Sequence, residues 1–411
     1  MGQTNKLAAI LMTTVFSFNQ LTYAQKVETT EDGSIVTYEK DYFDKFSAVT
    51  LLDMILIIPG GKEIIDKNQN QFRGNGANSQ GDRGFGSGGD QILIDGKRLA
   101  GKSNNIDDTL SRISATQIEK IELIRGAASG LDVQSQGLVI NITMAEGGDT
   151  ATTFWQVSGK YTFNNDFKPE FLVSRSGKLR GLDYSVSVAR ENGGFFYLRE
   201  EQAFDADDVK TSDQDVDAGF EWKNLKFNSN VSYSFENGGD LRLNGLFEPG
   251  GREGYEIRTK TTNVINPVTR LTDEDSDKWE FGGDYSRSLG ELGNLKALFV
   301  INRDKGDEIV NLTKGSGGGL FEFANEHTIE NKSEKIFRAS LTKGIGSKQF
   351  LELGGEVAIN TFDKSFLNNE RRNVLDVDIT AVVTDPFIIA NSDDVKIKEN
   401  RYEIFANHTY N

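Results

Sequence analysis

From residue 151 onward, hydrophobic and polar residues alternate with a period of two. In the first run Trp155, Val157 and Tyr161 fall on one face, and Gln156 and Ser158 fall on the other. Successive side chains of a β-strand point to opposite faces, so this pattern predicts strands with one apolar and one polar face. Comparable runs occupy residues 184–188, 227–235, 279–286, 351–359 and 402–410.

These runs are about ten residues long, which is the length that a tilted strand needs to cross the hydrocarbon core of a bilayer. A soluble β-sandwich is the alternative, but its strands are usually about five or six residues long. The polar faces carry Asn, Ser, Lys and Glu, as a water-filled lumen would. Residues 150–411 are therefore predicted to form antiparallel strands of a transmembrane β-barrel, with loops at 201–214 and 361–397.

The chain before residue 150 shows mixed periodicity. An apolar run, 48–58, stops at Pro59-Gly60 and predicts a short buried helix. Residues 106–113 predict an amphipathic helix, and a loop rich in Gly, Asn and Ser covers 72–90. Residues 41–149 are thus expected to form a compact α+β domain. Its predicted strands are 91–94, 121–124 and 138–143.

The N-terminus has the features of a secretory signal. Lys6 precedes an apolar run, 7–18, that is too short to span a bilayer, and small residues at 22 and 24 predict cleavage before Gln25. A buried N-terminal helix is the alternative interpretation of residues 1–24. Residues 25–40 are polar and charged, which favours a flexible arm.

Composition narrows the function. The net charge of −16 argues against a nucleic-acid partner, and the chain has no cysteine and only His327 and His408. No catalytic residues, no protein-built metal site and no cofactor are expected, so an enzyme is not expected. The glycines of 84–89 precede a strand, which does not suit phosphate binding. Two alternating acidic triplets, 213–217 and 273–277, lack the pattern of a calcium loop and favour solvated loops.

Several motifs occur in a fixed order over about a hundred residues. They are Arg83-Gly84-Phe85-Gly86, the strand and turn 92–98, the segment 118–126 that ends in Arg125-Gly126, and the closing 137–142. As a set they resemble the plug domain of TonB-dependent receptors. The chain departs from that family after Gly126, where Ala127 replaces the usual proline and a single Gly137 replaces a double glycine.

The resemblance implies a plug inside a barrel of about 22 strands in the Gram-negative outer membrane. It also implies a TonB-type periplasmic energy-coupling protein, outer-membrane lipid and a small chelate or oligosaccharide as partners. A TonB box would lie in the arm before the plug, since an extended segment can pair with a partner's strand edge. The candidate box is Ser34, Ile35, Val36, Thr37 and Tyr38; the alternative is that these residues begin the first plug strand.

The resemblance also suggests plug residues with roles. Glu122 and Arg125 are candidates for contact with the barrel, and Arg125 is expected to pair with an inward carboxylate unless it lies in a solvated turn. Arg83 and Phe85 are candidates for an apical plug loop. The expected function is energy-coupled uptake of a scarce solute such as an iron–siderophore chelate. A surface-exposed adhesion or sugar-binding protein and a non-functional receptor fragment are the alternatives.

The number of residues after 150 limits how many barrel strands the chain can supply. They supply about a dozen membrane-length strands, fewer than the resemblance implies. We therefore expect an open sheet around the plug, in which the Trp155 strand and the Tyr402 strand do not meet.

Overall fold

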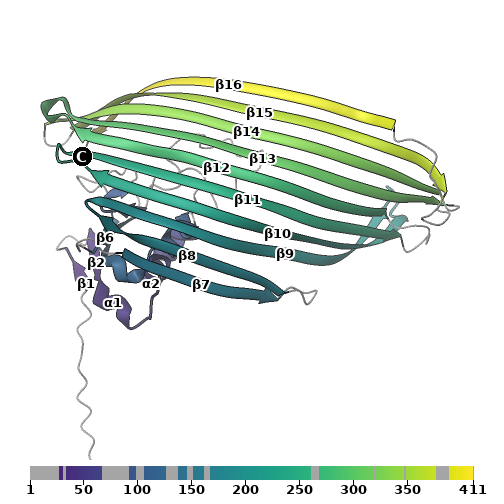
Figure 1. Cartoon of the computed structure of the whole chain (residues 1–411), viewed down its shortest axis with the longest axis horizontal. Helices are drawn as coiled ribbons and strands as arrows, with labels where there is room; N and C mark the ends of the chain where they lie inside the picture. The colour runs from purple at the N-terminus through teal and green to yellow at the C-terminus, as the bar shows by residue number, and fades with distance from the viewer. Residues whose placement is uncertain are drawn as a thin grey trace, which may run out of the picture.

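The structure, a computed structural model, contains two β-sheets that lie side by side (Figure 1). It describes residues 27–30, 34–66, 92–98, 106–125, 138–145, 151–161, 167–260, 268–317, 320–346, 349–375 and 388–410. The signal-peptide prediction for residues 1–24 and the apical-loop candidates Arg83 and Phe85 lie outside these residues.

The smaller sheet belongs to the N-terminal domain and has the strand order β1-β2-β5-β6-β3-β4. Strands β3 and β6 are parallel, and the other neighbours are antiparallel. The sheet is mixed, which confirms the predicted α+β domain. The elements are β1 (Val27–Thr29), β2 (Ile35–Glu39), α1 (Lys40–Asp44), α2 (Leu51–Ile57), β3 (Ile92–Ile94), β4 (Lys97–Arg98), α4 (Ile106–Ser111), the 3-10 turn η1 (Ala115–Gln117), β5 (Ile118–Arg125) and β6 (Leu138–Met144). A further helical segment covers 61–66.

Helix α2 packs its apolar residues into the core of this domain. Thr50 and Asp53 form a capping box at its start, and the helix ends just before Pro59. The side chains of Leu51 and Ile55 are completely buried. They belong to one cluster with the inward residues of the sheet, which include Ile92, Ile118, Ile121, Ile140 and Ile142. One face of the sheet and α2 therefore share a single hydrophobic core.

The structure differs from the predicted flexible arm at residues 25–40. Strand β2 pairs with β1 on one side and with β5 on the other, where Ile35 lies opposite Ile124. Tyr38 is buried in the core at 6% exposure. The neighbour that orders β2 lies more than 80 residues later in the chain, so the local sequence carried little sign of this pairing.

The larger sheet contains ten antiparallel strands in sequence order, from β7 to β16. Among the described residues, β7 and β16 are the two edges and do not pair with each other, which confirms the expected open sheet. The strands are β7 (Ala151–Tyr161), β8 (Phe167–Leu179), β9 (Leu182–Phe204), β10 (Lys210–Ser234), β11 (Gly239–Lys260), β12 (Val268–Ser288), β13 (Asn294–Gly317), β14 (Leu320–Ile345), β15 (Gln349–Leu375) and β16 (Ile388–Tyr410), with the 3-10 turn η2 (Gly290–Leu292) between β12 and β13.

Strands β9 to β16 are 21 to 27 residues long, about twice the predicted length. The predicted loops 201–214 and 361–397 were too long: β9 continues to Phe204 and β10 begins at Lys210, while β15 continues to Leu375 and β16 begins at Ile388. Polar and charged residues dominate 199–203 and 210–215, so hydrophobic alternation fades there although the ladder continues. The extra length places long strand segments beyond any bilayer.

The two ends of the large sheet differ. Short connections at 180–181, 235–238 and 289–293 join strands at one end. In outer-membrane barrels the short turns face the periplasm and the longer loops face outward. The other end, where the chain between Leu375 and Ile388 is longest, is therefore the extracellular end.

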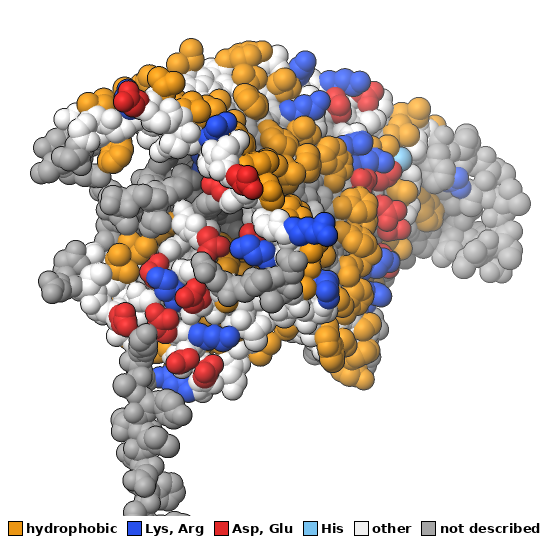
Figure 2. Space-filling model, turned by 60° about the vertical axis from the view of Figure 1, so that its left-hand side comes forward, with side chains coloured by type: hydrophobic (Ala, Val, Ile, Leu, Met, Phe, Trp, Pro, Cys, Tyr) orange, Lys and Arg blue, Asp and Glu red, His pale blue; other side chains and the backbone are white. Residues whose placement is uncertain are grey.

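Register identifies a lipid-facing surface near the short turns. A cross-strand row runs from Trp155 through Val173 and Phe227 to Phe247 and Trp279, all on the same face. Figure 2 shows hydrophobic side chains gathered over part of the surface and charged side chains intermixed elsewhere. We call this face the outer face and the opposite one the inner face. Within the described residues, no helix is long and apolar enough to span a membrane.

Candidate functional site

The small domain contacts the inner face of the large sheet at β8. The hydroxyl of Ser174 donates to the backbone carbonyl of Arg112 at 3.0 Å, and that of Ser176 donates to Oε1 of Gln117 at 2.6 Å. Both serines are buried, with exposures of 1% and 6%. The segment around η1 is thus held against the wall by hydrogen bonds between neutral groups, which are individually modest and can be broken and remade.

We expect the double variant Ser174→Ala and Ser176→Ala to loosen this docking. Losing two hydrogen bonds, each worth about 1 kcal/mol, should speed hydrogen exchange at the Ala115 and Gln117 amides by roughly tenfold or more. Ser234→Ala is the matched control, since it removes a serine hydrogen bond within the wall, to Asp240. Unchanged exchange at both amides in the double variant would contradict this docking.

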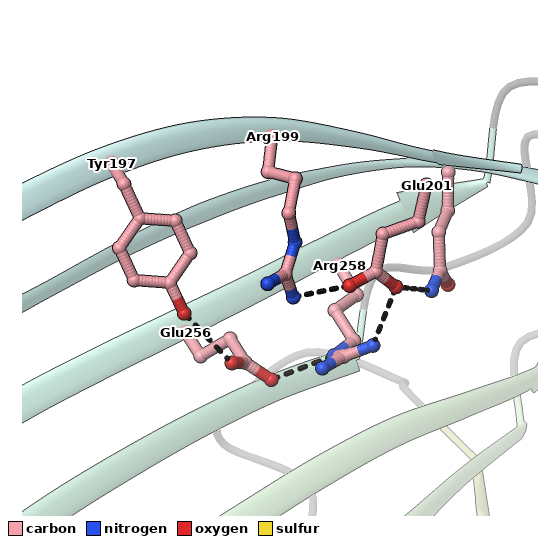
Figure 3. A network of polar contacts seen from close by, with 6 residues as sticks. Tyr197, Arg199, Glu201, Glu256 and Arg258 are labelled. Atoms are coloured by element: carbon pink, nitrogen blue, oxygen red, sulfur yellow. Dashed lines mark hydrogen bonds and ion pairs between the residues drawn. The ribbon is translucent and has the colours of Figure 1, made fainter.

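A continuous polar network lines the extracellular half of the inner face (Figure 3). Tyr197 donates to Glu256 at 3.5 Å, and Glu256 pairs with Nε of Arg258 at 2.6 Å. Arg258 also reaches Glu201 at 3.0 Å, and Glu201 is bonded to Arg199. Gln214 Nε2 donates to Glu201 at 2.6 Å. Three neighbouring strands, β9, β10 and β11, thus contribute to one chain of contacts.

The network keeps its groups charged. The hydrogen bond from Gln214 lowers the pKa of Glu201, and the charges of Arg199 and Arg258 lower it further against the opposing effect of desolvation. The hydrogen bond to Glu256 raises the pKa of Arg258. The Glu201 carboxylate and the Arg258 guanidinium therefore remain ionised at neutral pH, and they present hydrogen-bonding groups to the lumen.

Arg252 occupies a second charged position on the same face. Its guanidinium lies 2.8 Å from Glu274 and 3.1 Å from Glu308, and it lies over the ring of Phe220 at 5.6 Å. The ring of Phe195 is 5.4 Å from that of Phe220. Aromatic faces beside oriented charged groups are typical of sites that bind small molecules. This site was not predicted from the sequence, because Arg252 and Glu308 meet only through the register of three strands.

The candidate TonB box lies in the small sheet. Ile35 to Tyr38 are part of β2, and Ser34 directly precedes it. This position corresponds to the alternative that these residues begin the first plug strand. Both edges of β2 are occupied, whereas among the described residues β1 has a neighbour on one side only, and its three residues are exposed. Any partner strand would meet β1 before it could meet β2.

The structure shows the contacts of only one of the two candidate plug–barrel residues. Glu122 has partners inside the small domain: Lys120 at 2.6 Å and the side-chain amide of Asn141 at 2.9 Å. The Arg125 side chain lies outside the described residues, so its pairing with an inward carboxylate stays a prediction. The contacts with the wall that the structure does show are those of Arg112 and Gln117.

Acidic side chains are numerous on the large sheet, but they do not assemble a metal site. In the described part of the chain, no three His, Cys, Asp or Glu side chains lie close enough together to hold a metal ion. His327 instead lies 2.7 Å from Asp307.

Comparison with protein families decides the identity of the small domain. Residues 28–136 match the model of the TonB-dependent Receptor Plug Domain. The chain therefore carries the plug domain of a TonB-dependent receptor. Its small domain is the plug, its large sheet is the barrel wall, and the protein belongs to the outer membrane of Gram-negative bacteria. The match begins at residue 28, so it includes β2 and all but the first residue of β1.

Solved structures similar to this receptor have low sequence identity. The RagAB peptide importer in the 'closed-closed' state is 8% identical, with a TM-score of 0.36 over 78% of this chain and 47% of that one. The ferric yersiniabactin uptake receptor FyuA from Yersinia pestis is 13% identical, with a TM-score of 0.24 over 77% and 52%. The receptor spans about half the length of these two chains. The alcaligin outer membrane receptor FauA from Bordetella pertussis is 10% identical, with a TM-score of 0.22 over 91% and 77%. A comparison with curated proteins gave no match.

Proposed function

We propose that this receptor takes part in the energy-coupled uptake of a scarce small solute across the outer membrane. The observation that carries the proposal is the plug domain at residues 28–136, hydrogen-bonded to the inner face of the wall. TonB-dependent receptors are transporters rather than enzymes, and neutral hydrogen bonds such as those of Ser174 and Ser176 can be broken by a pull. The solute would be a chelate, such as an iron–siderophore complex, or an oligosaccharide.

The energy would come from a TonB-type periplasmic protein. The short turns assign the periplasmic side to the end of the wall where β8 holds the plug, so β1 and β2 lie in the domain that such a partner must reach. The exposed edge strand β1 offers backbone groups for strand addition. A pull on β1 would be transmitted to β2, which pairs with β5 in the plug core.

Uptake assays in the bacterium that produces the receptor test this proposal. A panel of labelled ferric chelates and oligosaccharides is offered to cells with and without the receptor. We expect one solute to enter only the cells that have it, and an uncoupler of the proton gradient to stop entry while leaving surface binding intact. Equal uptake of every solute by both strains, or uptake that persists with the uncoupler, would contradict the proposal.

Arg252→Ala should weaken binding of the transported solute by about tenfold or more, since a charge-assisted contact contributes about 1.5–3 kcal/mol. Equilibrium binding to intact cells measures the loss. Lys223→Ala is the matched control, because Lys223 forms an ion pair with Glu253 on the outer face of the same strands. If both variants bind like the parent, the inner wall around Arg252 is not the solute site.

A further inference from the structure

The outer face carries a second apolar area that the uptake function does not use. On β9 to β12 the apolar residues of the membrane band are followed, toward the extracellular end, by several polar outward positions. Apolar residues then return on the same face. They are Phe196 and Leu198 on β9, Tyr255 and Ile257 on β11, and Leu271 on β12. We call these five residues the outer patch.

Register makes the outer patch continuous. Tyr255 lies directly opposite Leu271, and its ring contacts that of Phe196 across Gly219 at 6.4 Å. Leu198 and Ile257 lie on either side of Asp217 in the next row. Leu198 is 80% exposed and Leu271 is 50% exposed. A contiguous apolar surface of this kind on an otherwise polar wall marks an interaction site.

The position of the outer patch excludes burial in lipid chains. On β10 the outward apolar residues end at Leu225, and the row of the patch crosses the strand at Asp217 and Gly219. Six to eight residues separate these points, which is roughly 20–26 Å along the strand. The patch thus stands in the extracellular layer above the hydrocarbon.

Carboxylates surround the outer patch. Asp215 and Asp217 border it on β10, and Glu253 borders it on β11. Asp273 and Asp275 continue the rim on β12, where Asp273 lies directly opposite Glu253. All five are exposed. They include two members of each acidic triplet that was predicted to lie in a solvated loop; the structure corrects this prediction and places the triplets in β10 and β12.

We infer that the outer patch docks a protein whose contact surface has an apolar centre ringed by Lys or Arg. The acidic rim favours such a partner by charge complementarity, and the apolar centre supplies the area that is removed from water. A second copy of this chain does not fit, since like rims would face each other and the chain carries a net charge of −16. Anionic lipid phosphates would be repelled, and among the described residues no three His, Cys, Asp or Glu side chains lie close enough to hold a bridging metal ion. The inference is independent of the proposed uptake function.

Photo-crosslinking in intact cells tests the outer patch. A benzoylphenylalanine at Leu198 is compared with one at Ile388, which is also exposed and extracellular but lies on the edge strand β16. We expect a protein adduct from position 198 and none from 388. Mass spectrometry should find the adduct on a partner segment that carries Lys or Arg beside apolar residues.

Charge reversal makes this test specific. Asp217→Lys combined with Asp273→Lys should reduce the adduct by at least tenfold, and 0.5 M salt should reduce it as well, because exposed charges are screened. Asp363→Lys, on the outer segment of β15, should leave it unchanged. The inference is overturned by no adduct, by an adduct only with lipopolysaccharide or another copy of the receptor, or by an adduct that survives the double reversal.

Discussion

Removing residues 25–40 is expected to unfold the plug while leaving the wall assembled. The deletion takes away β1 and β2 and the buried Tyr38, and it leaves β5 as an unpaired edge. Burial of one large side chain contributes about 1.5–3 kcal/mol, and partly buried Val36 adds to it. That loss is a large part of the roughly 5–15 kcal/mol that stabilises a domain of this size.

Hydrogen exchange of the full chain measures this effect. Amides of β5 should lose protection in the deletion variant, while those of β12 and β13 keep it. Glu28→Ala, at an exposed position of β1, is the control and should exchange like the parent. If β5 remains protected without residues 25–40, these residues are an arm rather than part of the plug fold.

A charge on the outer face should be far more disruptive than the same charge on the inner face. Phe227 and Asn230 lie on one strand, β10, but point to opposite faces. Phe227→Lys places an ammonium group in the lipid-facing row, which costs about 2–4 kcal/mol near the middle of a bilayer. Asn230→Lys keeps its charge on the polar inner face and should cost much less.

Chemical denaturation in lipid vesicles compares the two variants, with the midpoint followed by tryptophan fluorescence. We expect the denaturation midpoint to fall clearly for Phe227→Lys and to stay close to that of the parent for Asn230→Lys. Equal destabilisation of the two variants would mean that the face of Phe227 does not contact lipid.

Hydrophobic periodicity was sufficient to predict elements whose buried residues lie close together in the sequence. The apolar run that ends at Pro59 predicted α2, and the alternation around Phe227 and Trp279 predicted β10 and β12. It failed where strands leave the bilayer, because Asp215 and Asp273 face water and hide the alternation. The family resemblance supplied the plug as a whole, and the match at residues 28–136 confirms it.

The candidate site was harder to predict from the sequence than the fold was. Arg252, Glu274 and Glu308 come from three strands, and their approach depends on register that turns and pairing set over 56 residues. The plug contacts of Ser174 and Ser176 likewise join segments about 60 residues apart. Isolated Ser or Arg residues in alternating strands carry no sign of such partners.

The central claim is that the wall separates a lipid-facing outer face from an inner face that holds the plug and receives the solute. The three tryptophans of the chain test it directly, since Trp155 and Trp279 face outward and Trp222 faces inward. Single-tryptophan variants are reconstituted in vesicles of brominated phosphatidylcholine. We expect strong quenching of Trp155 and Trp279 and little of Trp222, whereas aqueous acrylamide should quench Trp222 most. Strong quenching of Trp222 by the brominated chains, with Trp155 and Trp279 unaffected, would contradict the account.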